Sequence, residues 1–192
     1  MKSNKSLIWT MIALIIMAAV YRIIPGRPWG FAPQIAMALF GGAVIKDKKW
    51  AFALPVFSMF LSDLLYQGLY NAGITPIYGF YEGQWLNYCL FALMVVIGFA
   101  VKKINVINVL AASLIAPTVF FLLSNFITWS GMAGLRGLNR PFTFPGLLMA
   151  YTDGLPFYKG ALEATLFFSA ILFGGYYLLT KNNTAAAKAA HA

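Results

Sequence analysis

The stretch from 31 to 66 most constrains what this chain can fold into. It reads as an apolar helix over 31–45, a basic turn of sequence KDKKW, and a second apolar helix over 50–66. At about 1.5 Å per residue, the first helix is shorter than the hydrocarbon core of a bilayer, which is about 30 Å thick. The preceding PGRPWG cannot continue a helix, because its two prolines and two glycines break the hydrogen-bond ladder.

Irregular backbone at membrane depth is tolerated only where it is buried in protein or lines a cavity. The short helix and the broken loop before it therefore predict one wall of a pocket that opens to one side. The alternative is a tilted helix in a locally thinned bilayer.

Composition places the chain among membrane proteins. Of its 192 residues, 61% are apolar and 10% are charged, whereas about a quarter of the residues of a soluble domain are charged. No polar segment is long enough to form a second core, so we expect one domain over 1–180 and a disordered cytoplasmic tail over 181–192. The net charge of +9 does not indicate nucleic acid, because the basic residues lie between apolar runs and do not cluster on one face.

Six apolar runs predict an all-α integral membrane protein with six transmembrane helices. The expected spans are 7–24, 31–45, 50–66, 85–101, 106–127 and 161–179. We expect Pro117 to kink the fifth span and residues 129–158 to form a long loop. The first run follows a basic start and could instead be a secretory signal, although no clear small-x-small cleavage site follows it.

The distribution of lysine and arginine predicts the orientation. With both termini cytoplasmic, nine of the 14 basic residues fall on the inner side and five on the outer side, which agrees with the positive-inside rule. The inner turns are short and basic, whereas the outer loops are long and aromatic. We therefore expect a multi-pass protein of the inner membrane whose function faces outward.

Polar and aromatic side chains at one depth predict a substrate site near the outer surface. Asp63 and Glu163 are the only carboxylates inside the predicted spans, and a charge at membrane depth usually faces the bundle interior or a wet cavity. An aromatic wall with a few polar anchors suits a small organic ligand. The predicted substrate-binding residues are Asp63, Tyr66, Trp85, Asn87, Asn125, Trp129 and Glu163.

Three alternatives remain open for these residues. Glu163 could pair with Lys159, which lies four residues earlier on the same helical face. Asp63 could sit at the membrane interface, and the rings could form an ordinary aromatic belt.

The sequence does not indicate catalysis, and we expect no enzyme, no cofactor and no metal. It contains no GxxxxGK[ST], GxSxG or HExxH motif, and its one histidine, His191, lies in the tail. No carboxylate or histidine lies in the inner half of a span, where a proton relay would need one. The single cysteine, Cys89, is expected to be an inert buried thiol, with ligation of a substrate-borne metal as the alternative. An active transporter would have to take its energy from a partner.

Small residues indicate where helices or partner proteins approach closely, because lipid gives no hydrophobic drive for association. One small-residue stripe lies in the span 161–179 and another in the span 31–45. One of them must close the bundle, and the other is free to receive a partner. We expect the stripe in 31–45 to dock the partner, because it adjoins the KDKKW turn, although both stripes could pack internally. Its residues are Ala32, Ala36, Ala38 and Gly42.

Several segments together resemble a known family. FAPQIAMALFGGA, LSDLL, SNFITW and GLLMAYTDGLPFYKGALEATLFFSAILFGG resemble the substrate-binding S components of energy-coupling factor (ECF) vitamin transporters, by way of a bacterial membrane family related to them. The match runs from the first span to Lys181. The resemblance implies an S-component-like bundle with a short second helix and a vitamin or similar micronutrient as the ligand.

The resemblance also implies a transmembrane coupling protein driven by two ATPases, on which the binder topples to release its substrate inside. S components commonly dock through small-xxx-small positions on the first helix, whereas here the spaced small pairs lie in the second. Two other functions remain open: a membrane scaffold or accessory subunit, and a solitary S-component-like importer that needs no ATPase.

Overall fold

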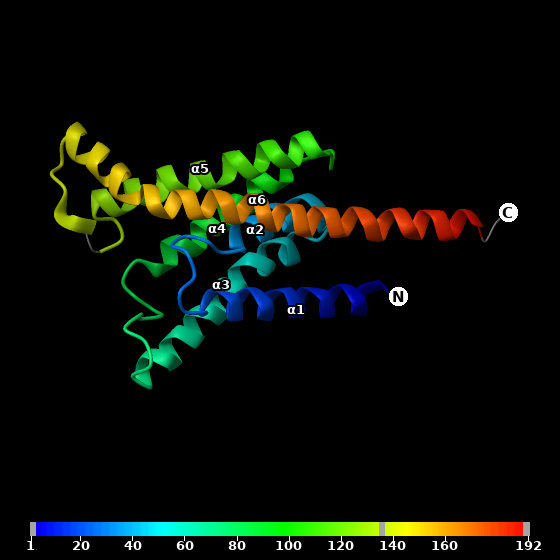
Figure 1. Ribbon diagram of the computed structural model, residues 1–192, viewed down its shortest axis with the longest axis horizontal. Coiled ribbons are helices and arrows are strands. Elements are labelled where there is room, and N and C mark those ends of the chain that lie inside the picture. The colour runs from blue at the N-terminus through cyan, green and yellow to red at the C-terminus, as the bar shows by residue number, and fades with distance from the viewer. Residues whose placement is uncertain (1–2, 135–136, 190–192) are drawn as a thin grey trace.

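The computed structural model describes residues 3–134 and 137–189, and every regular element in them is a helix (Figure 1). The elements in chain order are α1 (Ser3–Arg22), α2 (Gln34–Val44), α3 (Lys48–Asn71), α4 (Gln84–Phe99), α5 (Val106–Ser130), the 3-10 turn η1 (Gly137–Asn139) and α6 (Phe144–Ala189).

Three of these helices are long and apolar enough to cross a membrane: α3, α5 and the part of α6 from Phe144 to Lys181. This supports the membrane class. The apolar part of α1, Ile8–Arg22, is shorter, as are α2 and α4, so six full-length spans are not confirmed. The second helix is even shorter than predicted, with 11 residues, because it begins only after Pro33.

The short helix α2 lies at the centre of the bundle and packs against α3, α4, α5 and α6. Its residues 34–39 are all buried. A Cβ atom added to Gly42 would collide with the backbone of Val95 and Gly98, so α2 and α4 approach closely at this glycine. The core of the molecule is therefore built around α2.

This central position overturns the predicted partner-docking face. Ala36 and Ala38 are completely buried, Gly42 packs on α4, and Ala32 borders an internal cavity. The spacing of small residues predicted close helix packing, but spacing alone cannot distinguish a neighbour in the same chain from a second protein.

Helix α6 begins at Phe144, inside the segment that was predicted to be a loop. Pro145 lies in its first turn, where a missing N–H costs no hydrogen bond. Gly154 allows close packing on α5, because a Cβ there would collide with the Asn125 amide. The helix also continues to Ala189, where the sequence predicted a disordered tail, and His191 lies outside the described residues.

The start of α1 and the end of α6 lie at the same end of the molecule, and the connections over 72–83, 131–134 and 137–143 lie at the opposite end (Figure 1). The chain therefore returns to the side on which it began, as the predicted topology requires. That this side is cytoplasmic stays a prediction. Helix α5 runs as one helix across Pro117.

Candidate functional site

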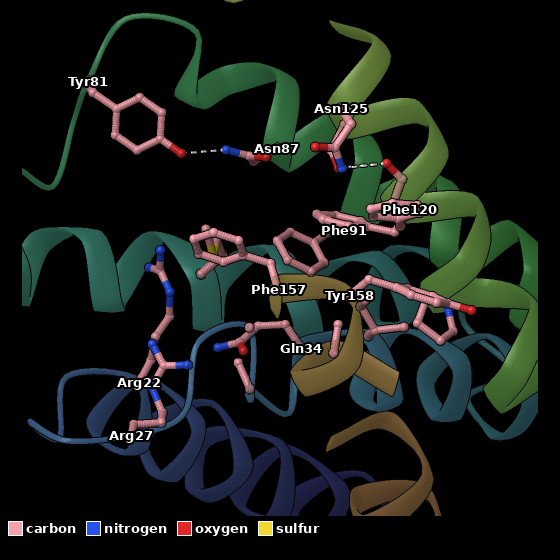
Figure 2. Close-up of a pocket in the computed structure, with 18 residues that line it drawn as sticks. Arg22, Arg27, Gln34, Tyr81, Asn87, Phe91, Phe120, Asn125, Phe157 and Tyr158 are labelled. Carbon is pink, nitrogen blue, oxygen red and sulfur yellow. Dashed lines mark hydrogen bonds between the residues drawn. The ribbon is translucent and has the colours of Figure 1, made fainter. Parts of the chain in front are cut away.

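A cavity of about 350 Å³ lies where the C-terminal end of α1 meets the N-terminal ends of α2 and α4. All six α-helices contribute residues to its lining, as do the loops before α2 and α4. Its volume falls within the range of about 300–1,000 Å³ that small-molecule sites occupy. In Figure 2, Arg22, Arg27 and Gln34 lie at the lower left of the cavity, and Phe91, Phe120 and Tyr158 lie toward its right.

Arg22, the last residue of α1, is held in place by a buried network. Its Nη1 atom lies 2.5 Å from Asp63 Oδ1 and donates to Ser62 Oγ at 2.6 Å. The other oxygen of Asp63 accepts hydrogen bonds from Tyr88 Oη, at 2.7 Å, and from Gln84 Nε2. Asp63 is only 1% exposed, so a buried carboxylate holds the guanidinium at the edge of the cavity.

Tyr66 adds a second support to Arg22. Its hydroxyl donates to the Arg22 carbonyl oxygen at 2.7 Å, and its ring lies 5.4 Å from the guanidinium carbon. Asp63 and Tyr66 thus fix the position of Arg22 from the side away from the cavity, and they do not themselves line it.

The second cation at the cavity, Arg27, has no such counterion. Its Nη1 donates to the Phe31 carbonyl oxygen at 2.7 Å. Its Nε is buried and has no hydrogen-bond partner, and no carboxylate lies within ion-pair distance of it in the described part of the chain.

Gln34, the first residue of α2, is the third polar group on this side. It is 1% exposed, and neither its amide nitrogen nor its amide oxygen has a partner among the residues that the structure describes. A buried amide without partners costs about 1–3 kcal/mol. In Figure 2 this amide lies on the same side of the cavity as the two guanidinium groups.

Aromatic rings form the opposite side. The ring centroids of Phe91 and Phe120 are 5.1 Å apart, and those of Phe121 and Tyr158 are 4.7 Å apart. The Tyr158 hydroxyl lies 2.9 Å from Thr118 Oγ1, which fixes the orientation of its ring. These pairs present a largely apolar surface to the cavity.

Three further polar residues complete the lining. Asn87 donates to Tyr81 Oη at 2.6 Å and to Gln84 Oε1 at 2.8 Å, which joins the lining to the Asp63 network. Asn125 donates to the Phe121 carbonyl oxygen at 2.8 Å. Loss of hydration raises the pKa of Tyr81, although the nearby Arg22 charge partly opposes the shift. Tyr81 is therefore a neutral hydroxyl at pH 7.

Of the seven residues predicted to bind substrate, only Asn87 and Asn125 line the cavity. Trp85 is 61% exposed, because its neighbours Gln84 and Leu86 occupy the inward face of α4. Trp129 donates from Nε1 to the Pro141 carbonyl oxygen at 3.0 Å, outside the cavity.

Glu163 is half exposed and lies 4.0 Å from Lys159, the i,i+4 pairing that the sequence left open. The single pocket that was to unite Asp63, Trp85, Asn125, Trp129 and Glu163 therefore does not form. Asn87 and Asn125 do line one cavity, but the rotation of each helix directs the other predicted side chains elsewhere.

Sequence reasoning treated Arg22 and Arg27 only as topology signals and did not single out Gln34. Two signals could have found them. In the predicted orientation, both arginines fall on the outer side, which the positive-inside rule disfavours. Gln34 is the only polar side chain of the predicted span 31–45, and such a residue at membrane depth calls for a partner.

A second cavity, of about 570 Å³, lies between the N-terminal half of α5 and the middle of α6. It is mostly apolar, but Ser113 and Ser169 both line it, and their buried hydroxyls have no partner in the described part of the chain. Gly174 also lines it, with open space where a Cβ would stand. We name this cavity the α5–α6 groove.

Cys89 is exposed, so the prediction of a buried thiol is wrong. The hydroxyl of the preceding residue, Tyr88, reaches Asp63. Cys89 is rotated about 100° from Tyr88 around α4 and does not line the cavity. Within residues 3–134 and 137–189, no cluster of three or more His, Cys, Asp or Glu side chains could hold a metal ion.

Comparisons with known proteins place the chain in a family. None of the curated proteins matches it, and neither does any solved structure. A family model described as "Family of unknown function (DUF6580)" matches residues 2–188, which is nearly the whole chain. The chain therefore belongs to the DUF6580 family.

Proposed function

We propose that this protein is the substrate-binding membrane subunit of an uptake system for a vitamin or related micronutrient, and that it works with an ATP-driven coupling module. The observation that carries the proposal is the cavity lined by all six α-helices, whose lining combines two arginines and a few amides with several aromatic rings. Such a mostly apolar site with a few fixed polar groups is typical of small-molecule binding.

The lining suits binding better than catalysis. No Asp, Glu, His or Cys is among the lining residues in the described part of the chain, and these are the residue types that most often transfer protons or act as nucleophiles. Arginine keeps its proton throughout the physiological pH range, so Arg22 and Arg27 can bind and orient a ligand without exchanging a proton with it.

In the proposed orientation both termini are cytoplasmic and the protein is multi-pass in the inner membrane. The cavity then opens toward the outer side, because Arg22 ends α1 and Gln34 begins α2. The short helices α1, α2 and α4 fit if the bilayer thins locally around them. The resemblance to S components supports the same arrangement.

The α5–α6 groove is the proposed docking face for a transmembrane helix of the coupling protein. The small-residue stripe in α2 is buried in the core and therefore cannot contact a partner protein. Lipid chains offer no hydrogen bonds to Ser113 and Ser169, whereas a partner helix with polar side chains does. The open space beside Gly174 also lets a second backbone approach closely.

Native mass spectrometry of the purified protein tests ligand binding directly. We expect a bound small molecule, and we expect Ala161→Trp, which fills the cavity, to lose it. Ala111→Trp is the matched control, because Ala111 is exposed on α5 and away from the cavity. A folded protein that carries no small molecule, and whose thermal stability no micronutrient changes, would instead favour a scaffold or accessory subunit.

Uptake assays test the partner. We expect Gly174→Leu to abolish uptake while ligand binding is retained, and Gly68→Leu to have no effect, because Gly68 also has open space but lies outside the groove. Uptake that persists in cells lacking the ATPase module would identify a solitary importer.

A further inference from the structure

We infer that the cavity binds a small organic anion: a carboxylate carried on a flat, largely apolar ring. This statement rests on the proposed binding function and names the chemical class of the ligand. Four features of the cavity support it.

The first feature is the uncompensated charge of Arg27. Of the two arginines that line the cavity, Arg22 is neutralised by Asp63, whereas Arg27 has no carboxylate partner in the described part of the chain. A partly buried cation without a counterion is costly. Its buried Nε has no partner either. The guanidinium fork matches the two oxygens of a carboxylate, which would satisfy both the charge and the free donor.

The second feature is Gln34. Its side chain is 1% exposed, and both polar atoms of its amide lack partners in the described residues, although buried polar groups are normally hydrogen-bonded. An amide offers a donor and an acceptor, so Gln34 can contact a carboxylate oxygen through its nitrogen and a ring substituent through its oxygen.

The third feature is the start of α2. Pro33, at its N-cap, supplies no side-chain hydrogen bond to the first turn, and the first two residues of the helix, Gln34 and Ile35, line the cavity. The N-terminus of a helix carries a partial positive charge and favours anions. No acidic side chain lines the cavity in the described part of the chain, so nothing there opposes this field.

The fourth feature is the ring-lined side opposite these groups. The pairs Phe91–Phe120 and Phe121–Tyr158 face the cavity, and aromatic walls of this kind stack on flat ligands. The volume of about 350 Å³ corresponds to about a dozen water volumes of about 30 Å³ each. A fused two-ring carboxylate fits within this volume.

Matched probes test the inference. We would measure the dissociation constants of 2-naphthoate, 2-naphthamide and decanoate for the purified protein by isothermal titration calorimetry. We expect 2-naphthoate to bind at least about tenfold more tightly than 2-naphthamide, because a charge-assisted hydrogen bond is worth more than a neutral one. We also expect it to bind more tightly than decanoate, which distinguishes a ring-bearing ligand from a fatty acid.

Two variants locate the anion site. Arg27→Gln should reduce the preference for 2-naphthoate over 2-naphthamide to about one. Gln34→Glu, which is isosteric and places a carboxylate in the site, should weaken 2-naphthoate binding at least about tenfold and leave 2-naphthamide binding nearly unchanged. The controls are Lys159→Gln and Gln67→Glu, which lie outside the cavity and should keep the preference.

The outcomes separate this inference from the proposed function. Equal binding of the two naphthyl probes, a preference that survives Arg27→Gln, or no binding of any probe would overturn the anion class. If native mass spectrometry then showed a bound neutral or cationic molecule, the proposed function would stand without the anion class. If it showed no bound molecule, the proposed function would fail as well.

Discussion

The ion pair between Arg22 and Asp63 makes the sharpest prediction about stability. Its two residues lie 41 positions apart and join the end of α1 to the middle of α3. The perturbation is a double-mutant cycle that consists of Arg22→Met, Asp63→Leu and the variant with both changes. These substitutions remove each charge and keep an apolar side chain in its place.

The magnitude follows from burial. Asp63 is 1% exposed and the Arg22 side chain is 17% exposed, so either single change leaves an uncompensated buried charge, at a cost of about 3–5 kcal/mol. Asp63→Leu also removes the acceptor of Gln84 and Tyr88. With both charges removed, the protein no longer buries an unpaired ion. We therefore expect the double variant to be more stable than the sum of the two single losses predicts, by about 3 kcal/mol.

The assay is reversible unfolding by sodium dodecyl sulfate in mixed micelles, followed by tryptophan fluorescence, which gives the free energy of unfolding of each variant. Arg140→Met and Asp153→Leu form the matched control cycle. Their pair is bidentate, at 2.8 and 2.9 Å, whereas Arg22 and Asp63 meet through one nitrogen and one oxygen, but the control pair is about one-third exposed on both sides. We expect a smaller coupling there, because water screens exposed pairs.

Additive losses at Arg22 and Asp63, within about 0.5 kcal/mol, would refute this reasoning, because independent sites add to that accuracy. Such a result would mean that the two groups do not compensate each other's charge in the folded protein. A coupling equal to that of the exposed control pair would refute the role assigned to burial.

Packing elsewhere in the bundle leads to further expectations. Gly42→Ala should lower the free energy of unfolding by about 1–3 kcal/mol, because its Cβ meets the α4 backbone, whereas Gly174→Ala should be close to neutral in the same detergent titration. Trp129→Ala should leave ligand affinity unchanged in calorimetry, because Trp129 lies outside the cavity, and a tenfold loss would contradict this placement. In a cysteine-free background, an impermeant thiol reagent applied from outside should label a cysteine at Asn139 but not one at Lys48, and the reverse would overturn the proposed orientation.

The sequence by itself determined the class of protein and much of its local structure. Apolar runs and few charges indicate membrane helices, and the length of one run predicts the short second helix. These features are local, because helix length and charge spacing do not depend on which helices become neighbours. The pairing of Lys159 with Glu163 could be anticipated from the sequence for the same reason, because residues four apart are neighbours on any helix.

Only the tertiary structure decided which side chains share a site. Successive residues of a helix point about 100° apart, so Gln84 is buried while Trp85 is exposed at the same depth. The sequence fixes neither this rotation nor the neighbours of each face. The partner of Arg22 is 41 residues away, and the burial of α2 follows from four helices packing around it. Long-range packing therefore placed Arg22, Arg27 and Gln34 together. Their shared position depends on which helices become neighbours, and the local sequence does not determine that.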